Sequence, residues 1–131
     1  KRMTFPIDLI PKVKDYFQTG SSVIVSPPVL DTDEDWVVLF RDYVQQRETL
    51  TYLVQQGWVR DGKEYKSAEI DRSFASFRKD KINLITMVSA QFYEKYKLAT
   101  KIATVLNLQD KAQRVAVFEL IREFDLPSAR W

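Results

Sequence analysis

The sequence predicts an α/β (α+β) fold, with a mixed β-sheet packed by helices and a pair of helices at the C-terminal end. Two observations predict this class. Strand-like and helix-like patterns alternate along the chain, roughly in the order α-β-β-α-β-β-α-α. One apolar run of strand length, 36–40, suits a strand that is buried on both faces. The chain of 131 residues can bury one hydrophobic core, so a single domain over 1–131 is the simplest organisation.

The N-terminal segment predicts one helical element followed by a strand. Segment 7–16 mixes apolar and charged residues, and Pro11 fits a helix there only in its first turn. Residues 16–19 leave too little length for another helical turn before Gly20. We therefore expect a short strand that ends at this glycine.

An acidic segment then leads into the apolar strand. Segment 22–29 is expected to follow an extended or turning path, because Pro27 and Pro28 exclude a central strand. Residues 31–35 predict an acidic turn. The apolar strand 36–40 begins directly after this turn, so the acidic side chains lie at its start.

The middle of the chain predicts a helix and a pair of strands. Segment 41–56 reads as a helix, and Gly57 is a suitable residue to end it. Asp61-Gly62 is a turn signal. Segments 73–78 and 82–88 predict paired strands joined by the polar turn Lys79-Asp80-Lys81.

Two helices are expected at the C-terminal end. Ser89 is a favourable N-cap for a long helix that ends at about Leu108. Asp110 and Gln113 resemble a capping box, which predicts a last helix through Phe124.

Composition excludes several kinds of chemistry. The chain has no cysteine and no histidine, which excludes disulfides, thiol nucleophiles, histidine bases and most zinc sites. Carboxylates that bind a hard metal such as Mg²⁺ remain as the natural option. The net charge of +2 is too small to indicate nucleic-acid binding by itself. No apolar run reaches membrane-spanning length and no signal peptide is recognisable, so we expect a cytoplasmic location and no membrane partner.

One constellation carries most of the chemical information. Asp33 and Asp35 are two positions apart, so a strand would point both carboxylates to the same side. Two converging carboxylates are unfavourable unless a cation lies between them, and Mg²⁺ meets that need while also binding phosphate oxygens. Gly20 allows the backbone to approach a phosphate closely, and the Ser21 hydroxyl can donate a hydrogen bond to it.

This pattern resembles the DNA polymerase β-like nucleotidyltransferase superfamily. Its mark is Gly-Ser, a gap of about ten residues, and Asp-x-Asp within an apolar strand, which here is Gly20-Ser21 and then Asp33-Glu34-Asp35. More narrowly, the chain resembles small single-domain nucleotidyltransferase-like proteins of bacteriophages. The matching motifs, which span most of the chain, are Pro27-Pro28, 31–36, Phe77-Arg78, Asn83-Leu84-Ile85 and Leu106-Asn107-Leu108.

The resemblance implies a minimal nucleotidyltransferase fold that binds a nucleoside triphosphate with Mg²⁺ or Mn²⁺. It implies that Gly20, Ser21 and Ser22 contact the nucleotide. Metal would be held by Asp33 and Asp35, with Asp31 as an additional acidic residue just upstream. A phage origin would place the protein in the host cytoplasm.

The resemblance also implies a third acidic residue on a later strand, which completes a two-metal site and activates the attacking hydroxyl. This sequence has Asn83 at the expected catalytic position. An amide oxygen can ligate a metal but cannot act as a base. Glu69 or Asp71 could take the place of the missing carboxylate.

Other interpretations of these residues remain open. An acidic run is often a solvated turn, although Gly-Ser at the right distance favours a site. An EF-hand is rejected, because its sixth position requires glycine and the sequence has Trp36. Arg78 lies in the predicted hairpin with Lys79 and Lys81, and these cations either form an ordinary polar turn or contact a triphosphate or nucleic-acid backbone.

Three functions are compatible with the sequence. The first is a metal-dependent nucleotidyltransferase that transfers a nucleoside monophosphate to an acceptor hydroxyl, on an RNA 3′ end or a protein. The second is a catalytically impaired phage protein with the same fold, which binds and inhibits a host protein or nucleic acid. Asn83 favours this second function. The third is an interaction module that acts through its surface.

Overall fold

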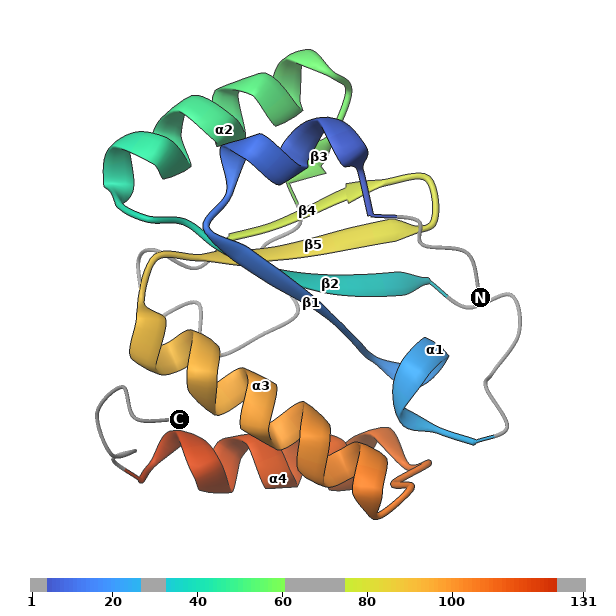
Figure 1. The fold of residues 1–131 in the computed structure, drawn as a ribbon. Coiled ribbons are helices and arrows are strands. Elements are labelled where there is room, and N and C mark those ends of the chain that lie inside the picture. The colour runs from blue at the N-terminus through green and yellow to red at the C-terminus, as the bar shows by residue number, and fades with distance from the viewer. Residues whose placement is uncertain (1–4, 27–32, 61–74, 125–131) are drawn as a thin grey trace.

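The protein folds as a five-stranded mixed sheet with helices on both faces (Figure 1). The computed structural model describes residues 5–26, 33–60 and 75–124. The elements are η1 (Ile7–Lys12, a 3₁₀-helix), β1 (Asp15–Thr19), α1 (Ser21–Ile24), β2 (Glu34–Leu39), α2 (Tyr43–Gln55), β3 (Val59–Arg60), β4 (Ala75–Lys79), β5 (Ile82–Met87), α3 (Ala90–Val105) and α4 (Lys111–Arg122). The predicted mixed sheet packed by helices, with a C-terminal helical pair, is confirmed.

The sheet has the order β1-β2-β5-β4-β3. β2 pairs antiparallel with β1 and parallel with β5, and the other pairs are antiparallel. β4 and β5 form the predicted hairpin across a polar turn, in which Asp80 adopts φ 54°. Asp tolerates this left-handed conformation better than most residues, which explains its place there.

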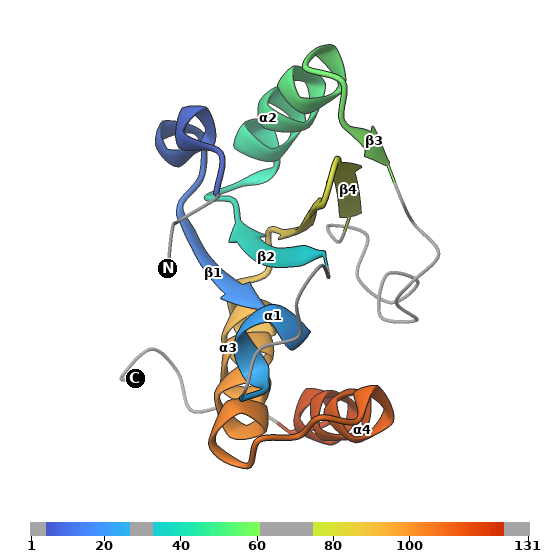
Figure 2. The ribbon, with the colours of Figure 1, turned by 90° about the vertical axis from the view of Figure 1, so that its right-hand side faces the viewer.

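β2 is buried on both faces, as its apolar run predicts. Trp36 and Val38 pack into one hydrophobic cluster with residues of η1 and α2. Val37 and Leu39 pack into a second cluster with residues of α3 and α4. Alternate side chains of a strand point to opposite faces, so each face of the sheet has its own helical layer. Figure 2 shows α4 beside α3, on the side of the molecule where β4 lies.

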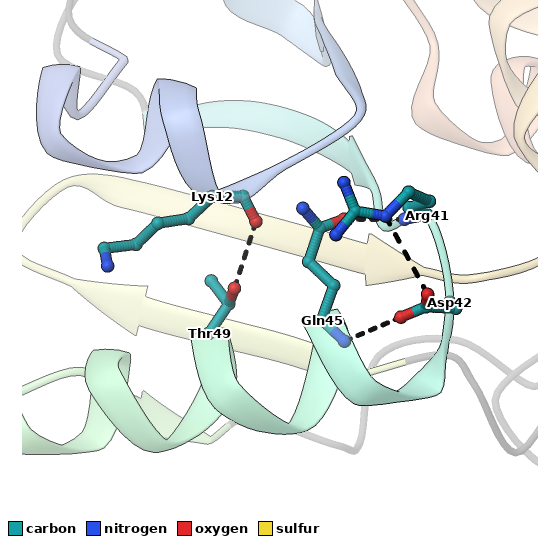
Figure 3. Close-up of polar contacts among 5 residues, drawn as sticks. All are labelled: Lys12, Arg41, Asp42, Gln45 and Thr49. Carbon is teal, nitrogen blue, oxygen red and sulfur yellow. Dashed lines mark hydrogen bonds and ion pairs between the residues drawn. The ribbon is translucent and has the colours of Figure 1, made fainter.

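Polar contacts cap the N-terminus of α2 and connect this helix to η1 (Figure 3). The Asp42 side chain accepts a hydrogen bond from the backbone nitrogen of Gln45 at 2.8 Å, which caps the helix. The Gln45 side chain in turn accepts from the backbone nitrogen of Arg41 at 2.7 Å. Thr49 donates from Oγ1 to the Lys12 carbonyl at 3.0 Å, so the helical layer is joined by more than apolar contact.

The predicted helix caps are found in the structure. Ser89 accepts from the backbone nitrogen of Phe92, and Asp110 accepts from that of Ala112. Gly57 follows the end of α2 with φ 92°, and the backbone nitrogen of Trp58 donates to the Leu53 carbonyl. This pattern is a Schellman motif, which favours glycine at that position.

Several local predictions are corrected. Segment 22–29 was expected to be extended, but its described part contains most of α1, because Ile24 and Val25 pack against Ala103 of α3. Pro11 lies late in η1 rather than in its first turn, which costs one hydrogen bond in a short 3₁₀-helix. β3 was not predicted, since two residues give no periodicity. Pro27-Pro28 and Asp61-Gly62 lie outside the described residues.

In the described part of the chain, no helix has the length and apolar character that crossing a membrane requires.

Candidate functional site

The site is built around a contact between Gly20 and Asp35. Gly20 follows β1 with φ 83° and ψ −179°, a backbone conformation essentially restricted to glycine. A Cβ atom at this position would lie 2.2 Å from Oδ2 of Asp35. The Asp35 carboxylate therefore packs directly on the Gly20 backbone, and two independent constraints require glycine there.

Four polar residues form a row across the sheet at the level of Asp35. The strand register pairs Thr19 with Asp35, Asp35 with Asn83, and Asn83 with Arg78. Asp35 lies two positions before Val37, which packs against α3 and α4. Alternation along the strands therefore places the whole row on the face covered by these two helices.

Asn83 lies buried in the middle of this row, with 1% of its surface exposed. Its Nδ2 donates to Oδ1 of Asp35 at 3.1 Å, and its Oδ1 accepts from the Ser76 hydroxyl at 2.9 Å. Both ends of the amide are thus engaged. In this arrangement Asn83 offers Asp35 a hydrogen-bond donor, and its oxygen is directed to Ser76.

The two ends of the row also have partners. The hydroxyl groups of Thr19 and Thr100 lie 2.8 Å apart, which links β1 to α3. Arg78 forms an ion pair with Asp33, in which Nη1 contacts Oδ2. Both side chains of this pair are partly exposed. Asp33 directly precedes β2, two positions from Asp35, so its carboxylate reaches the same side of the strand.

A pocket of about 870 Å³ lies between this row and the two C-terminal helices. Its volume falls within the range of small-molecule sites. The lining residues come from the end of β1 and α1, from the start of β2, from β4, and from α3 and α4: Thr19, Gly20, Ser21, Ile24, Asp33, Asp35, Arg78, Tyr96, Ala99, Thr100, Ala103, Lys111, Arg114, Val115, Phe118, Glu119 and Arg122.

The pocket brings together most of the residues singled out in the sequence. Gly20, Ser21, Asp33, Asp35 and Arg78 all line it. Asp33 and Asp35 therefore line the same cavity, which agrees with the expectation that both carboxylates point to one side of the strand.

Two other residues from the sequence analysis, Ser22 and Asn83, are described by the structure but do not line the pocket. Ser22 is buried outside the pocket lining, and its hydroxyl accepts from Gln18 Nε2 at 3.3 Å. Asn83 supports Asp35 from within the sheet instead of lining the cavity. Asp31, together with Glu69 and Asp71, lies outside the described residues.

Two carboxylates, Asp33 and Asp35, line the cavity, and carboxylate oxygens are ligands that a hard cation prefers. Arg78 balances the charge of Asp33, and Asn83 donates to Asp35. Within 5–26, 33–60 and 75–124, no three acidic side chains gather into a group that could hold a metal ion.

The sequence analysis missed the contribution of α4. Lys111, Arg114 and Arg122 line the pocket from this helix. Their spacing of three and then eight residues places them on one helical face. This spacing could have indicated from the sequence that the helix presents a cationic face. The sequence analysis considered only the apolar face of this helix, which includes Ile121, and not its charged face.

Comparison of the sequence with protein-family models and with curated proteins gives no match. Among solved structures, the chain is similar to the conserved protein GrpB from Enterococcus faecalis, with a TM-score of 0.49 and 13% sequence identity. The similarity covers 88% of this chain and 81% of the GrpB chain.

Proposed function

We propose that the protein is a metal-dependent nucleotidyltransferase, which transfers a nucleoside monophosphate from a nucleoside triphosphate to an acceptor hydroxyl. The observation that carries this proposal is the shared pocket. Asp33 and Asp35 line it together with the Gly20-Ser21 turn and with cations from β4 and α4. Acidic ligands for a divalent cation and basic ligands for phosphates in one cavity are the combination that phosphoryl transfer requires.

Each residue has a distinct role in this proposal. Asp33 and Asp35 hold Mg²⁺ or Mn²⁺, which supplies charge neutralisation at the phosphates and at the acceptor hydroxyl. Gly20 allows the chain to pass close to the phosphates, and Ser21 donates a hydrogen bond to them. Arg78 exchanges its carboxylate partner Asp33 for a phosphate oxygen.

The reaction is an in-line displacement at the α-phosphorus. The acceptor oxygen forms a bond to this phosphorus, the bond to the bridging oxygen breaks, and pyrophosphate leaves with that electron pair. The hydroxyl proton passes to solvent. The residues on the pocket walls contribute by positioning the reactants and stabilising charge. An RNA 3′ end or a protein side chain is the acceptor.

A second function is favoured by one observation. Asn83 occupies the central position of the polar row, donates to Asp35 and cannot accept a proton from the acceptor hydroxyl. A protein with this site can bind a nucleotide without transferring it, and act on a host protein or nucleic acid through the bound complex.

Label transfer tests the first function. The protein is incubated with Mg²⁺ or Mn²⁺, labelled nucleoside triphosphates and cell extract, and labelled RNA and protein are separated on gels. We expect labelled product with the parent and none with Asp35→Asn. Asp42→Asn is the matched control, because this residue caps α2 on the opposite layer and asparagine is also a good cap. Transfer that survives Asp35→Asn contradicts the proposal.

Calorimetry distinguishes the two functions. Binding of a nucleoside triphosphate that requires Mg²⁺ and Asp35, in the absence of any labelled product, identifies the second function. If neither binding nor transfer depends on Asp35, both functions are wrong.

A further inference from the structure

Three cations of α4 share one wall of the pocket. Lys111, Arg114 and Arg122 lie on the same helical face and all line the cavity. α4 packs mainly against α3, so the position of this wall is set by helix–helix packing and not by strand pairing.

Arg122 is partly buried, with 23% of its side-chain surface exposed, and its guanidinium has unusual hydrogen bonding. Its Nε and Nη1 atoms are shielded from solvent and have no hydrogen-bond partner within the described part of the chain. Its Nη2 atom forms an ion pair with Oε2 of Glu119 at 2.7 Å. Unsatisfied N–H groups of a cation are costly, so an anion that reaches this side chain gains more than it would at the surface.

Arg114 is held in place by the chain that precedes α4. Its Nη1 atom donates to the carbonyl groups of Leu108 and Gln109, at 2.9 and 2.8 Å. One nitrogen of the guanidinium is thus used to fix its position, while the side chain still lines the pocket. A guanidinium held in this way loses little entropy when it binds a ligand.

The charges of the pocket suit a polyphosphate. Its lining has four cationic side chains and three carboxylates, a surplus of one positive charge. A divalent cation at Asp33 and Asp35 would raise this surplus, and a triphosphate would then offset it. The volume of about 870 Å³ fits a small molecule and is too small for a folded nucleic acid.

We infer that α4 is the phosphate-binding wall of the pocket, in which Arg114 and Arg122 bind a polyphosphate chain. The identity of this chain as a nucleotide triphosphate rests on the proposed function. Glu119 acts as a competing anion that holds Arg122 until the phosphate enters.

The test is calorimetric titration of the full chain with inorganic tripolyphosphate in the presence of EDTA. We expect the association constant to fall at least about tenfold in the double variant Arg114→Gln/Arg122→Gln. Arg41→Gln is the control, because this exposed arginine lies at the start of α2 and should leave binding unchanged. Equal binding by the parent and the double variant overturns the inference.

A second variant tests the inference through a gain of binding instead of a loss. Glu119→Gln removes the competing carboxylate, so we expect tripolyphosphate to bind more tightly than to the parent, by a few fold. Unchanged or weaker binding in a variant that keeps the parent's circular dichroism spectrum contradicts the assignment. This variant keeps the proposal testable if the double variant does not fold.

The result of this titration can be distinguished from the result of the label-transfer experiment, because EDTA removes any contribution of metal at Asp33 and Asp35. Tripolyphosphate binding that follows the α4 variants, without any label transfer, leaves the inference standing and refutes the enzyme. If the double variant transfers label with the same KM as the parent, the result supports the enzyme and refutes the inference.

Discussion

The backbone of Gly20 and the carboxylate of Asp35 touch each other, with no room for a side chain between them. This contact joins the end of β1 to β2 at the floor of the pocket. It fixes where the Asp35 carboxylate lies relative to the turn that begins α1. Gly20 and Asp35, which are fifteen positions apart in the sequence, are thus in direct contact in the site.

Gly20→Ala is expected to lower the free energy of unfolding by about 3 kcal/mol, because the Cβ atom meets Asp35 and the backbone conformation strongly favours glycine. Gly57→Ala is the matched control. Gly57 also has a positive φ, but a Cβ atom added there would lie 4.0 Å from its nearest neighbour, a side-chain carbon of Lys79. We expect a loss of about 1 kcal/mol there. Urea denaturation of both variants measures the difference, and equal losses would refute the steric argument.

Ser76→Ala should destabilise the protein by about 1–3 kcal/mol. The buried Ser76 hydroxyl donates to Asn83 Oδ1, and its removal leaves that oxygen without this donor. Thermal and chemical denaturation measure the loss. In the double variant Ser76→Ala/Asn83→Leu, the Ser76 substitution should cost much less, because the acceptor is gone. Additive losses would mean that the two side chains are not coupled.

Asn83→Asp replaces a donor to Asp35 with a second carboxyl group. The proximity of Asp35 and burial should raise the pKa of the new carboxyl, so the loss of stability relative to the parent should be small at low pH and grow as the pH rises above about 4. At neutral pH, Mg²⁺ should restore part of the lost melting temperature, and the increase should exceed that of the parent. Melting curves with and without Mg²⁺ measure this effect. The same variant should increase label transfer if the missing carboxylate limits the enzyme.

The Tyr52 hydroxyl donates to the Asp8 carboxylate, and this bond joins α2 to η1. The hydrogen bond, with minor effects of burial and of the Asp8 charge, raises the pKa of Tyr52 above its ordinary value of 10.0. The contribution to stability is therefore fully present below pH 10 and is lost as the pH rises through the raised pKa.

Tyr52→Phe should lower the melting temperature at neutral pH, and the difference from the parent should shrink in strongly alkaline buffer. Tyr43→Phe, at an exposed position of the same helix, is the control and should have little effect. A difference that stays constant across the alkaline range would show that Tyr52 does not act through its proton.

Local sequence rules predicted the elements that depend on near neighbours. Ser89 and Asp110 cap their helices because each hydroxyl or carboxyl accepts from a nitrogen two or three positions away. β2 was predicted because its apolar run suits burial on both faces. α1 was missed because its turn depends on Ile24 packing against Ala103, far along the chain.

The geometry around the candidate site was predicted in the same uneven way, whereas the functional roles of its residues stay predictions. The spacing of Asp33 and Asp35 placed both carboxylates at one cavity, since two positions along a strand point to one side. Nothing in the spacing indicated that Arg78 would pair with Asp33, because that contact depends on the register of β4, β5 and β2.

By itself, the sequence determined the strands β1, β2, β4 and β5, the helix caps and the expectation that Asp33 and Asp35 point to one side, because these depend on periodicity and on neighbours along the chain. The tertiary structure decided that Asn83 donates to Asp35, that Gly20 forms the floor beneath that carboxylate, and that α4 turns its cations toward the pocket. These features depend on strand register and on helix packing, which bring together groups from distant parts of the chain.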